Sequence, residues 1–214
     1  MGIRELKVEG AYEITPQVFN DERGFFVSPY QERNFVRYTG RALFPVVQSS
    51  FNKSRRGVVR GVHFTAVPPG MAKYVFSPLG KVLDVVVDLR VGSPRYGMWD
   101  SVVLDQRSVR AVYLPVGVGH MTVALEDDTV VSYLLSTEYV RENELAVSPL
   151  DPRLELPIPA DIDPLLSERD REAPTLEEAE RAGILPDYAT SVFKEKGGDE
   201  RARRSEDERD LYQP

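Results

Sequence analysis

Residues 1–150 carry many short apolar runs in which hydrophobic and polar positions alternate, the pattern of half-buried β-strands. In the clearest run, residues 83–89, every second position is Leu or Val, and the positions between include Asp84 and Asp88. Shorter runs occur at residues 46–47, 58–62, 74–76, 101–104, 111–114, 122–125 and 130–135. Turn-forming Gly, Pro and Asp separate the runs at spacings of roughly 8–12 residues. The pattern predicts a mostly-β fold, an antiparallel sandwich or barrel rather than alternating βαβ units.

The pattern changes near residue 150. Repeated X-Pro pairs between residues 151 and 164 exclude a regular helix there. A short helix is predicted at residues 175–183, where Thr175 can cap the N-terminus, Glu178 completes a capping box and Gly183 ends the helix. From residue 194 to 210 nearly every residue is charged, Gly or Ser. The chain is therefore predicted to form one domain, residues 1–193, followed by a disordered tail, residues 194–214.

Composition narrows the function classes. The 214 residues are 42% hydrophobic and 29% charged, as in ordinary globular domains. A net charge of -7 argues against nucleic acid and membrane as partners. The chain shows neither a signal peptide nor an apolar run of ~18 residues, so a cytoplasmic location is expected. The absence of cysteine excludes disulfides, zinc–thiolate sites and cysteine nucleophiles.

Chemistry that needs imidazole must use His63 or His120, because the chain has 2 histidines. His63 follows Arg60 and Gly61 on a predicted strand, where successive side chains point to opposite faces. A bulge at Gly61 can turn Arg60 and His63 towards one cavity. Positive charge gathers in the same region, at Lys53, Arg55, Arg56 and Arg60. Such a patch fits a small anion such as a diphosphate, but the same sequence is also compatible with a basic hairpin exposed to solvent.

His120 follows a turn-forming segment that contains Pro115, Gly117 and Gly119, which is expected to place the imidazole at the mouth of a barrel. With 2 histidines and no His-x-His pair, a three-histidine metal site is excluded. A site of two histidines and one carboxylate stays open but has no support in the sequence. No resident metal is expected.

Several of these segments occur together in the order typical of one family. They read Arg60-Gly61-Val62-His63-Phe64, Lys73-Tyr74-Val75, Tyr113-Leu114-Pro115, Gly119-His120, Ser167-Glu168-Arg169-Asp170 and Leu185-Pro186-Asp187-Tyr188. Over roughly residues 3–190 the chain resembles the dTDP-4-dehydrorhamnose 3,5-epimerase family. The resemblance implies a cupin-type jelly-roll barrel of antiparallel strands, with a few short C-terminal helices, and a homodimer. Residues 68–73 and 125–128 resemble the branch of the family that serves antibiotic deoxysugar pathways.

The resemblance also implies the reaction. The substrate would be a dTDP-4-keto-6-deoxyhexose, whose protons at C-3 and C-5 are acidic because both carbons adjoin the C-4 ketone, and no cofactor would be required. His63 matches the base and Asp170 the carboxylate that orients it. Lys73 matches a cation near the C-4 oxygen, and Tyr133 matches the acid that returns a proton from the opposite face. Local sequence alone would single out neither Asp170 nor Tyr133.

Further matches concern substrate binding, at Arg23, Gln48, Arg60, His120 and Tyr139. Arg60 matches a diphosphate contact, and Arg23 matches an arginine that reaches the nucleotide from the partner subunit. The chain departs from the family pattern after Gln48, where Ser50-Phe51-Asn52 stands in place of the common Asn-His-Ser, and before Lys73, where Met71-Ala72 replaces a common Gln.

Inversion is expected at C-5, with action at C-3 or at both carbons as close alternatives. A ketosugar 3,4-isomerase would start with the same proton removal, but those enzymes typically carry paired histidines on one strand, which this sequence lacks. A non-catalytic cupin that binds a nucleotide sugar would keep the basic patch without needing His63 and Tyr133 opposite each other.

Overall fold

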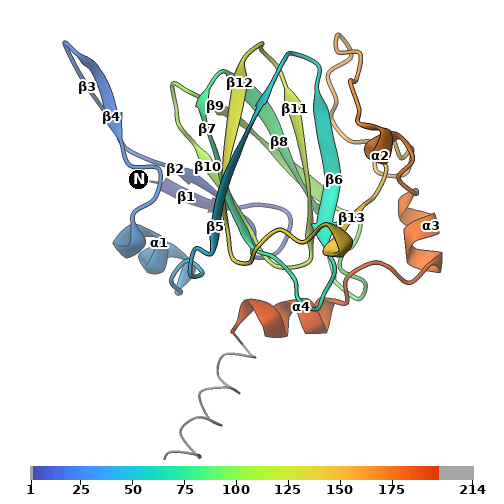
Figure 1. Ribbon diagram of the computed structural model, residues 1–214. Coiled ribbons are helices and arrows are strands. Elements are labelled where there is room, and N and C mark those ends of the chain that lie inside the picture. Colours follow the sequence, from blue (N-terminus) through green and yellow to red (C-terminus); the bar gives the residue numbers. More distant parts are fainter. Residues whose placement is uncertain (1, 198–214) are drawn as a thin grey trace, which may run out of the picture.

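The protein, described by a computed structural model over residues 2–197, is built on two antiparallel β-sheets that face each other (Figure 1). The six-stranded sheet has the order β1 (Gly2–Glu5), β2 (Tyr12–Thr15), β10 (Ala111–Leu114), β7 (Lys73–Leu79), β12 (Thr129–Leu135) and β5 (Gln48–Ser54). The five-stranded sheet has the order β13 (Glu144–Ala146), β6 (Val59–Thr65), β11 (Val118–Ala124), β8 (Lys81–Asp88) and β9 (Trp99–Asp105). The predicted mostly-β antiparallel barrel is confirmed.

The remaining elements are short. A separate hairpin pairs β3 (Val18–Asp21) with β4 (Gly24–Val27). The helices are α1 (Glu32–Thr39), the 3-10 helix η1 (Arg141–Asn143), α2 (Glu168–Arg171), α3 (Leu176–Arg181) and α4 (Tyr188–Glu195). Within residues 2–197 no helix is long and apolar enough to span a membrane.

Strand β8 confirms the alternation at residues 83–89, but both of its faces are buried. Val85 and Val87 pack on the outer face of the five-stranded sheet, against the chain that follows residue 145. The other face, which carries Asp84 and Asp88, points into the space between the sheets, where Val86 joins the interior cluster. Both aspartates are fully buried. They are tolerated because each carboxylate has a partner, His120 for Asp84 and Arg90 for Asp88.

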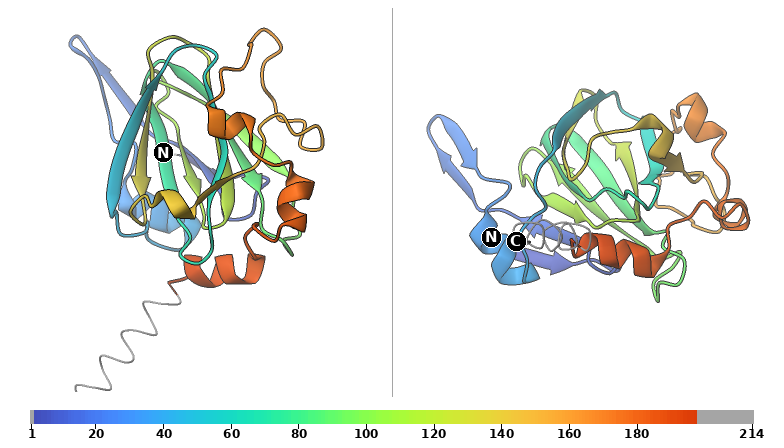
Figure 2. Two further views of the ribbon diagram at one scale, coloured as in Figure 1. Left: turned by 45° about the vertical axis from the view of Figure 1, so that its right-hand side comes forward. Right: turned by 60° about the horizontal axis from the view of Figure 1, so that its bottom comes forward.

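Two segments cover the outer faces of the sheets (Figure 2). The proline-punctuated segment and α3 lie over the five-stranded sheet, where Leu154 and Leu176 enter its outer cluster. Helix α1 lies against the six-stranded sheet, and its Phe35 packs on Tyr74 and Tyr113. Most strands of the two sheets are therefore buried on both faces, whereas the outward side chains of β5, such as Phe51, stay exposed.

Helix α3 forms as the sequence predicts. The Thr175 side chain accepts a hydrogen bond from the Glu178 backbone, and the Glu178 side chain accepts one from the Thr175 backbone, which completes the capping box. The helix ends at Arg181, and Gly183 adopts a positive φ of 66° just beyond it. This left-handed residue stops the helix, since glycine adopts that conformation without steric cost.

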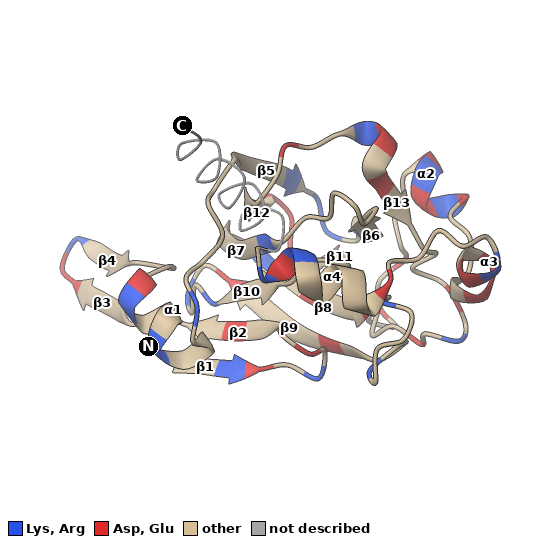
Figure 3. Ribbon diagram, turned by 90° about the horizontal axis from the view of Figure 1, so that it is seen from below, with Lys and Arg blue, Asp and Glu red and all other residues tan. Residues whose placement is uncertain are grey.

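Helix α4 lies across one end of the barrel, where basic and acidic residues are mixed rather than gathered into one patch (Figure 3). The helix runs to Glu195, past the predicted domain end at residue 193. The Glu195 carboxylate accepts hydrogen bonds from Arg41, the Tyr113 hydroxyl and the Val116 backbone N–H. These contacts tie α4 to the body of the domain. Most of the predicted disordered tail, residues 198–214, lies outside the described residues.

Candidate active site

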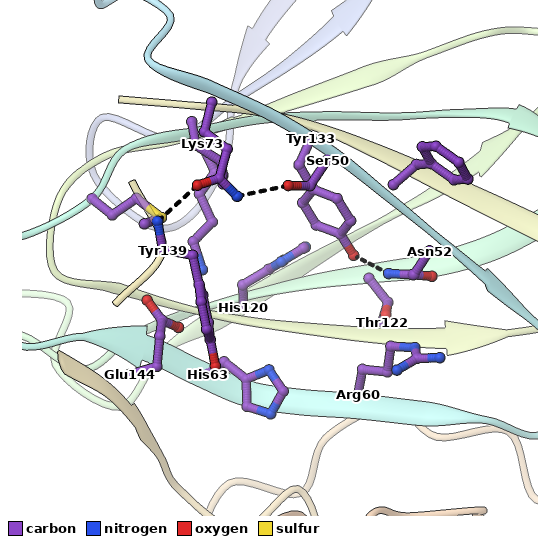
Figure 4. Close-up of a pocket in the computed structure, with 14 residues that line it drawn as sticks. Ser50, Asn52, Arg60, His63, Lys73, His120, Thr122, Tyr133, Tyr139 and Glu144 are labelled. Atoms are coloured by element: carbon purple, nitrogen blue, oxygen red, sulfur yellow. Dashed lines mark hydrogen bonds between the residues drawn. The ribbon is translucent and has the colours of Figure 1, made fainter. Parts of the chain in front are cut away.

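A cavity of about 420 Å³ lies between the two sheets (Figure 4). The six-stranded sheet lines it with Gln48, Ser50 and Asn52 from β5, Lys73 from β7 and Tyr133 from β12. The five-stranded sheet lines it with Arg60 and His63 from β6, and His120 and Thr122 from β11. The structure therefore brings together residues predicted separately along the sequence, and it divides them between two opposing walls.

A bulge in β6 turns Arg60 and His63 to the same side. His63 pairs with His120 across the sheet and Arg60 pairs with Thr122, so two residues of β6 stand opposite one residue of β11. Gly61 lies in the bulge with a φ of 132°, and a Cβ there would lie 2.5 Å from the His120 carbonyl oxygen. Only glycine fits this backbone. The bulge predicted at Gly61 is confirmed.

His63 forms a hydrogen bond with Asp170, Nε2 to Oδ1, at 2.7 Å. Asp170 is 2% exposed and sits in α2, where its backbone N–H donates to the capping Ser167 hydroxyl. Burial lowers the pKa of His63 below its ordinary value and outweighs the opposite effect of Asp170. The imidazole is thus neutral near pH 7. With one ring nitrogen held by the carboxylate, the other is available to take a proton.

Tyr133 faces His63 from the opposite sheet. Its hydroxyl accepts a hydrogen bond of 2.9 Å from Asn52 Nδ2. Burial, followed by the charge of Asp84, raises the pKa of Tyr133 to about 12, although Asn52 and Arg60 act the other way. The phenol therefore keeps its proton at neutral pH. It can therefore donate a proton from the wall opposite His63.

Lys73 begins β7 and points into the same cavity (Figure 4). Burial lowers the pKa of its ammonium group, and the carboxylate of Glu144 acts in the opposite direction. Glu144 lines the cavity and accepts a hydrogen bond from the Thr65 hydroxyl. An ammonium group at this partly buried position can interact with negative charge on an oxygen bound in the cavity more strongly than it could in bulk solvent.

His120 lies deeper than the expected position at the mouth. It is 5% exposed, and its Nε2 is 2.7 Å from Asp84 Oδ2. The expected location at the mouth is wrong because the turn at Pro115 ends at Val118, where β11 begins, and His120 lies within this strand. The second oxygen of Asp84, Oδ1, has no hydrogen-bond partner among the described residues. His120 still lines the cavity, beside His63 and edge-on to the ring of Tyr133, with the ring centroids 6.0 Å apart.

Gln48, Tyr139 and Arg60 also line the cavity. The Gln48 side chain accepts a hydrogen bond of 2.8 Å from the Tyr139 backbone N–H and donates one of 2.8 Å to the Ser50 hydroxyl. Of the basic residues predicted as a patch, Arg60 lines the cavity, whereas Lys53 pairs with Asp128 and Arg56 with Asp161. Fewer basic side chains of the predicted patch are therefore available to an anion in the cavity than the sequence indicates.

Arg23 is not in this cavity. It follows β3 in the projecting hairpin, its side chain is 90% exposed, and it pairs with Asp21 at 2.5 Å. This hairpin, β3 and β4, extends away from the two sheets (Figure 1). Its side chains Phe19, Phe25 and Phe26 are exposed. The predicted role of Arg23 in the site of a partner subunit stays a prediction.

Asn52, Thr122 and Glu144 also line the cavity, although no role is predicted for them from the sequence. A signal for Asn52 was present, because Gln48, Ser50 and Asn52 are polar at every second position of one strand. That period is typical of a strand with one wet or ligand-facing side. As for metals, the described residues contain no group of three or more His, Asp or Glu side chains arranged to hold an ion.

Comparison with known proteins decides the family. The family model for dTDP-4-dehydrorhamnose 3,5-epimerase matches residues 5–178. The chain belongs to this family. Its activity is therefore that of an isomerase, the epimerisation of a dTDP-4-keto-6-deoxyhexose, and the resemblance inferred from the sequence is confirmed.

Individual relatives agree. A dTDP-4-dehydrorhamnose 3-epimerase of Streptomyces niveus is 50% identical over 190 residues, 89% of this chain and 91% of the relative. The structure of NovW, a 4-keto-6-deoxy sugar epimerase from the novobiocin gene cluster of Streptomyces spheroides, has a TM-score of 0.85 at 49% identity, covering 89% of this chain and 95% of that one. ChmJ, a 3'-monoepimerase from Streptomyces bikiniensis in complex with dTDP-quinovose, has a TM-score of 0.85 at 43% identity, covering 90% and 96%.

Proposed function

We propose that the sugar ring of a dTDP-4-keto-6-deoxyhexose binds between the two sheets, with His63 on one side and Tyr133 on the other. The observation that carries this proposal is the division of a neutral imidazole and a protonated phenol between opposing walls of one cavity. Inversion of a carbon needs a base on one face and an acid on the other, because a single group returns the proton to the face from which it came.

The reaction proceeds in two proton transfers. His63 removes the proton from a carbon next to the C-4 ketone, and the electron pair of the broken C–H bond moves into the ring to give an enolate. Lys73 stabilises the negative charge on the C-4 oxygen, while Asp170 stabilises the imidazolium. Tyr133 then protonates the same carbon from the opposite face. The imidazolium loses its proton to solvent, and the phenolate regains one, which resets the site.

The nucleotide end of the substrate is assigned to the mouth of the cavity. Arg60 binds the diphosphate, and Gln48 and Tyr139 lie beside the nucleotide. Arg23 completes this site from a second copy of the chain. Support for a homodimer comes from the hairpin, which carries Arg23 and exposed phenylalanines away from its own domain.

We infer that both C-5 and C-3 are inverted, as in the name of the family. The alternative is inversion at C-3 alone, which the names of the Streptomyces niveus relative and ChmJ support for those proteins. The origin of NovW in the novobiocin biosynthetic gene cluster supports a role in antibiotic deoxysugar biosynthesis. The cytoplasmic location stays a prediction.

Proton NMR of the protein with a dTDP-4-keto-6-deoxyhexose in D₂O tests the proposal. Deuterium is expected at C-3 and C-5, with inversion at each, and His63→Ala should abolish both. Exchange at C-3 alone identifies a C-3 epimerase, and exchange at C-5 alone identifies a C-5 epimerase. Migration of the ketone to C-3 identifies a 3,4-isomerase, and binding without exchange identifies a non-catalytic cupin. Unimpaired exchange by His63→Ala would show that another group is the base.

A further inference from the structure

A chain of hydrogen bonds links the cation at the cavity mouth to the hydroxyl of Tyr133. Arg60 Nε donates to Ser54 Oγ at 3.2 Å. Ser54 Oγ donates to Asn52 Oδ1 at 3.4 Å, and Asn52 Nδ2 donates to the Tyr133 hydroxyl oxygen at 2.9 Å. Because Arg60 lies in β6 and the other three residues in β5 and β12, the chain joins the two sheets.

The chemistry of these groups fixes the direction of the chain. A guanidinium group can only donate, so the Ser54 oxygen accepts from Arg60 and its own proton is free for Asn52. The carbonyl oxygen of Asn52 accepts this proton, which leaves the NH₂ group of the amide facing Tyr133. As the amide donates to the phenol oxygen, this contact does not use the phenol proton, which can point away from Asn52. The Thr122 side chain also contacts the phenol.

The residues that surround this series of hydrogen bonds also hold it in place. Ser54 is 7% exposed and does not line the cavity, so it can act on a ligand only through its neighbours. Asn52 stands on the inward side of β5, opposite Val131 of β12, two residue pairs along the ladder from the pair of Tyr133 with Ser50. The strand register therefore fixes the position from which the amide reaches the phenol.

We propose that Asn52 is a positioning residue that aims the Tyr133 proton at the substrate carbon and couples this aim, through Ser54, to Arg60. The inference rests on the proposed function, since it assumes that Tyr133 is the acid and Arg60 the diphosphate contact. Its consequence is that the enolate is protonated on the Tyr133 face more often when this chain of contacts is intact. When these hydrogen bonds are broken, the enolate is protonated more often on the His63 face.

The test separates proton loss from inversion. In D₂O, protonation from the His63 side yields deuterated substrate without inversion, and protonation by Tyr133 yields inverted product. The ratio of deuterated, non-inverted substrate to product is measured at early times for the wild type, Asn52→Asp and Ser54→Ala. Asn52→Asp keeps the shape of the side chain but replaces the donor with an acceptor. Ser49→Ala, on the outward side of β5, is the matched control.

The ratio is expected to rise roughly three- to tenfold in Asn52→Asp, the range expected for one hydrogen bond. It should rise less in Ser54→Ala and stay at the wild-type value in Ser49→Ala. The double variant with Asn52→Asp and Ser54→Ala should give the same ratio as Asn52→Asp alone, because both changes interrupt the same series of hydrogen bonds. An unchanged ratio in Asn52→Asp would overturn the inference even if total turnover falls. If the rise in the double variant equals the product of the rises in the two single variants, the link through Ser54 is overturned. Absence of exchange in the wild type would instead overturn the proposed function and the inference with it.

Discussion

Arg60 and His63 lie on the same side of β6, although the alternation of a regular strand would place them on opposite faces. The bulge between them supplies the extra residue that brings both side chains into one cavity. The local backbone at Gly61 thus determines whether the proposed diphosphate contact and the proposed base can act on one ligand.

Replacement of Gly61 by Ala should be strongly destabilising. The new Cβ would meet the His120 carbonyl oxygen at 2.5 Å and Met121 Cα at 2.7 Å, and alanine disfavours the φ of 132°. We expect a loss of at least about 2 kcal/mol in the free energy of unfolding, measured by denaturant titration. Gly24 has the same φ with open space around it, so Gly24→Ala isolates the backbone cost, about 1 kcal/mol. Equal losses in the two variants would show that the close approach at Gly61 is unimportant.

Replacement of Asp170 by Asn should change the pH profile in a defined direction. Activity requires neutral His63, so the acidic limb of kcat/KM follows the pKa of His63, which burial lowers below 6.5. The hydrogen bond and the charge of Asp170 raise this pKa, and removing the charge should therefore move the limb to lower pH. We expect kcat to fall about 10²-fold at the same time, because the orienting contact is weakened. Asp161→Asn, at an exposed ion pair, is the control; a limb that moves to higher pH would contradict this reasoning.

Tyr133→Phe should separate the two halves of the reaction. Without the phenol proton we expect inversion to fall about 10²- to 10³-fold, while deuterium still enters the substrate through His63. Time-resolved proton NMR in D₂O measures both rates in one sample. Full inversion by this variant would assign the acid to another group in the cavity.

Arg23→Ala tests whether a second copy of the chain completes the site. Since the Arg23 side chain is exposed and distant from its own cavity, its loss should leave the fold intact and raise KM for the nucleotide sugar about tenfold with little change in kcat. Sedimentation of the wild type should give a dimer. An unaltered KM, or a monomer with full activity, would remove Arg23 from the site.

The sequence allowed prediction of features that depend on neighbouring residues. The capping box at Thr175, the strand at residues 83–89 and the bulge at Gly61 each follow from local rules, and all three are present. The pairing of His63 with Asp170 joins positions 107 residues apart, and no local pattern marks an aspartate in a charged four-residue helix as a partner of histidine. For that pair only the resemblance to a family was informative. Neither local rules nor the resemblance to a family predicted the contact of Asn52 with Tyr133. The two residues are 81 positions apart, and their contact depends on the register of β5 with β12.

His63 and Tyr133, the proposed base and acid, stand on different sheets, and an apolar cluster that includes Val75, Val86 and Val131 lies between those sheets beside the cavity. These valines do not line the cavity, yet their volumes help to set the distance between the wall that carries His63 and the wall that carries Tyr133. Shortening one of them should bring the walls closer or let them fluctuate, which alters the ratio of inversion to exchange without any change in a polar residue. The hydrophobic core thus acts as a spacer between the two walls of the cavity, and its thickness is a quantity on which the ratio of inversion to exchange should depend.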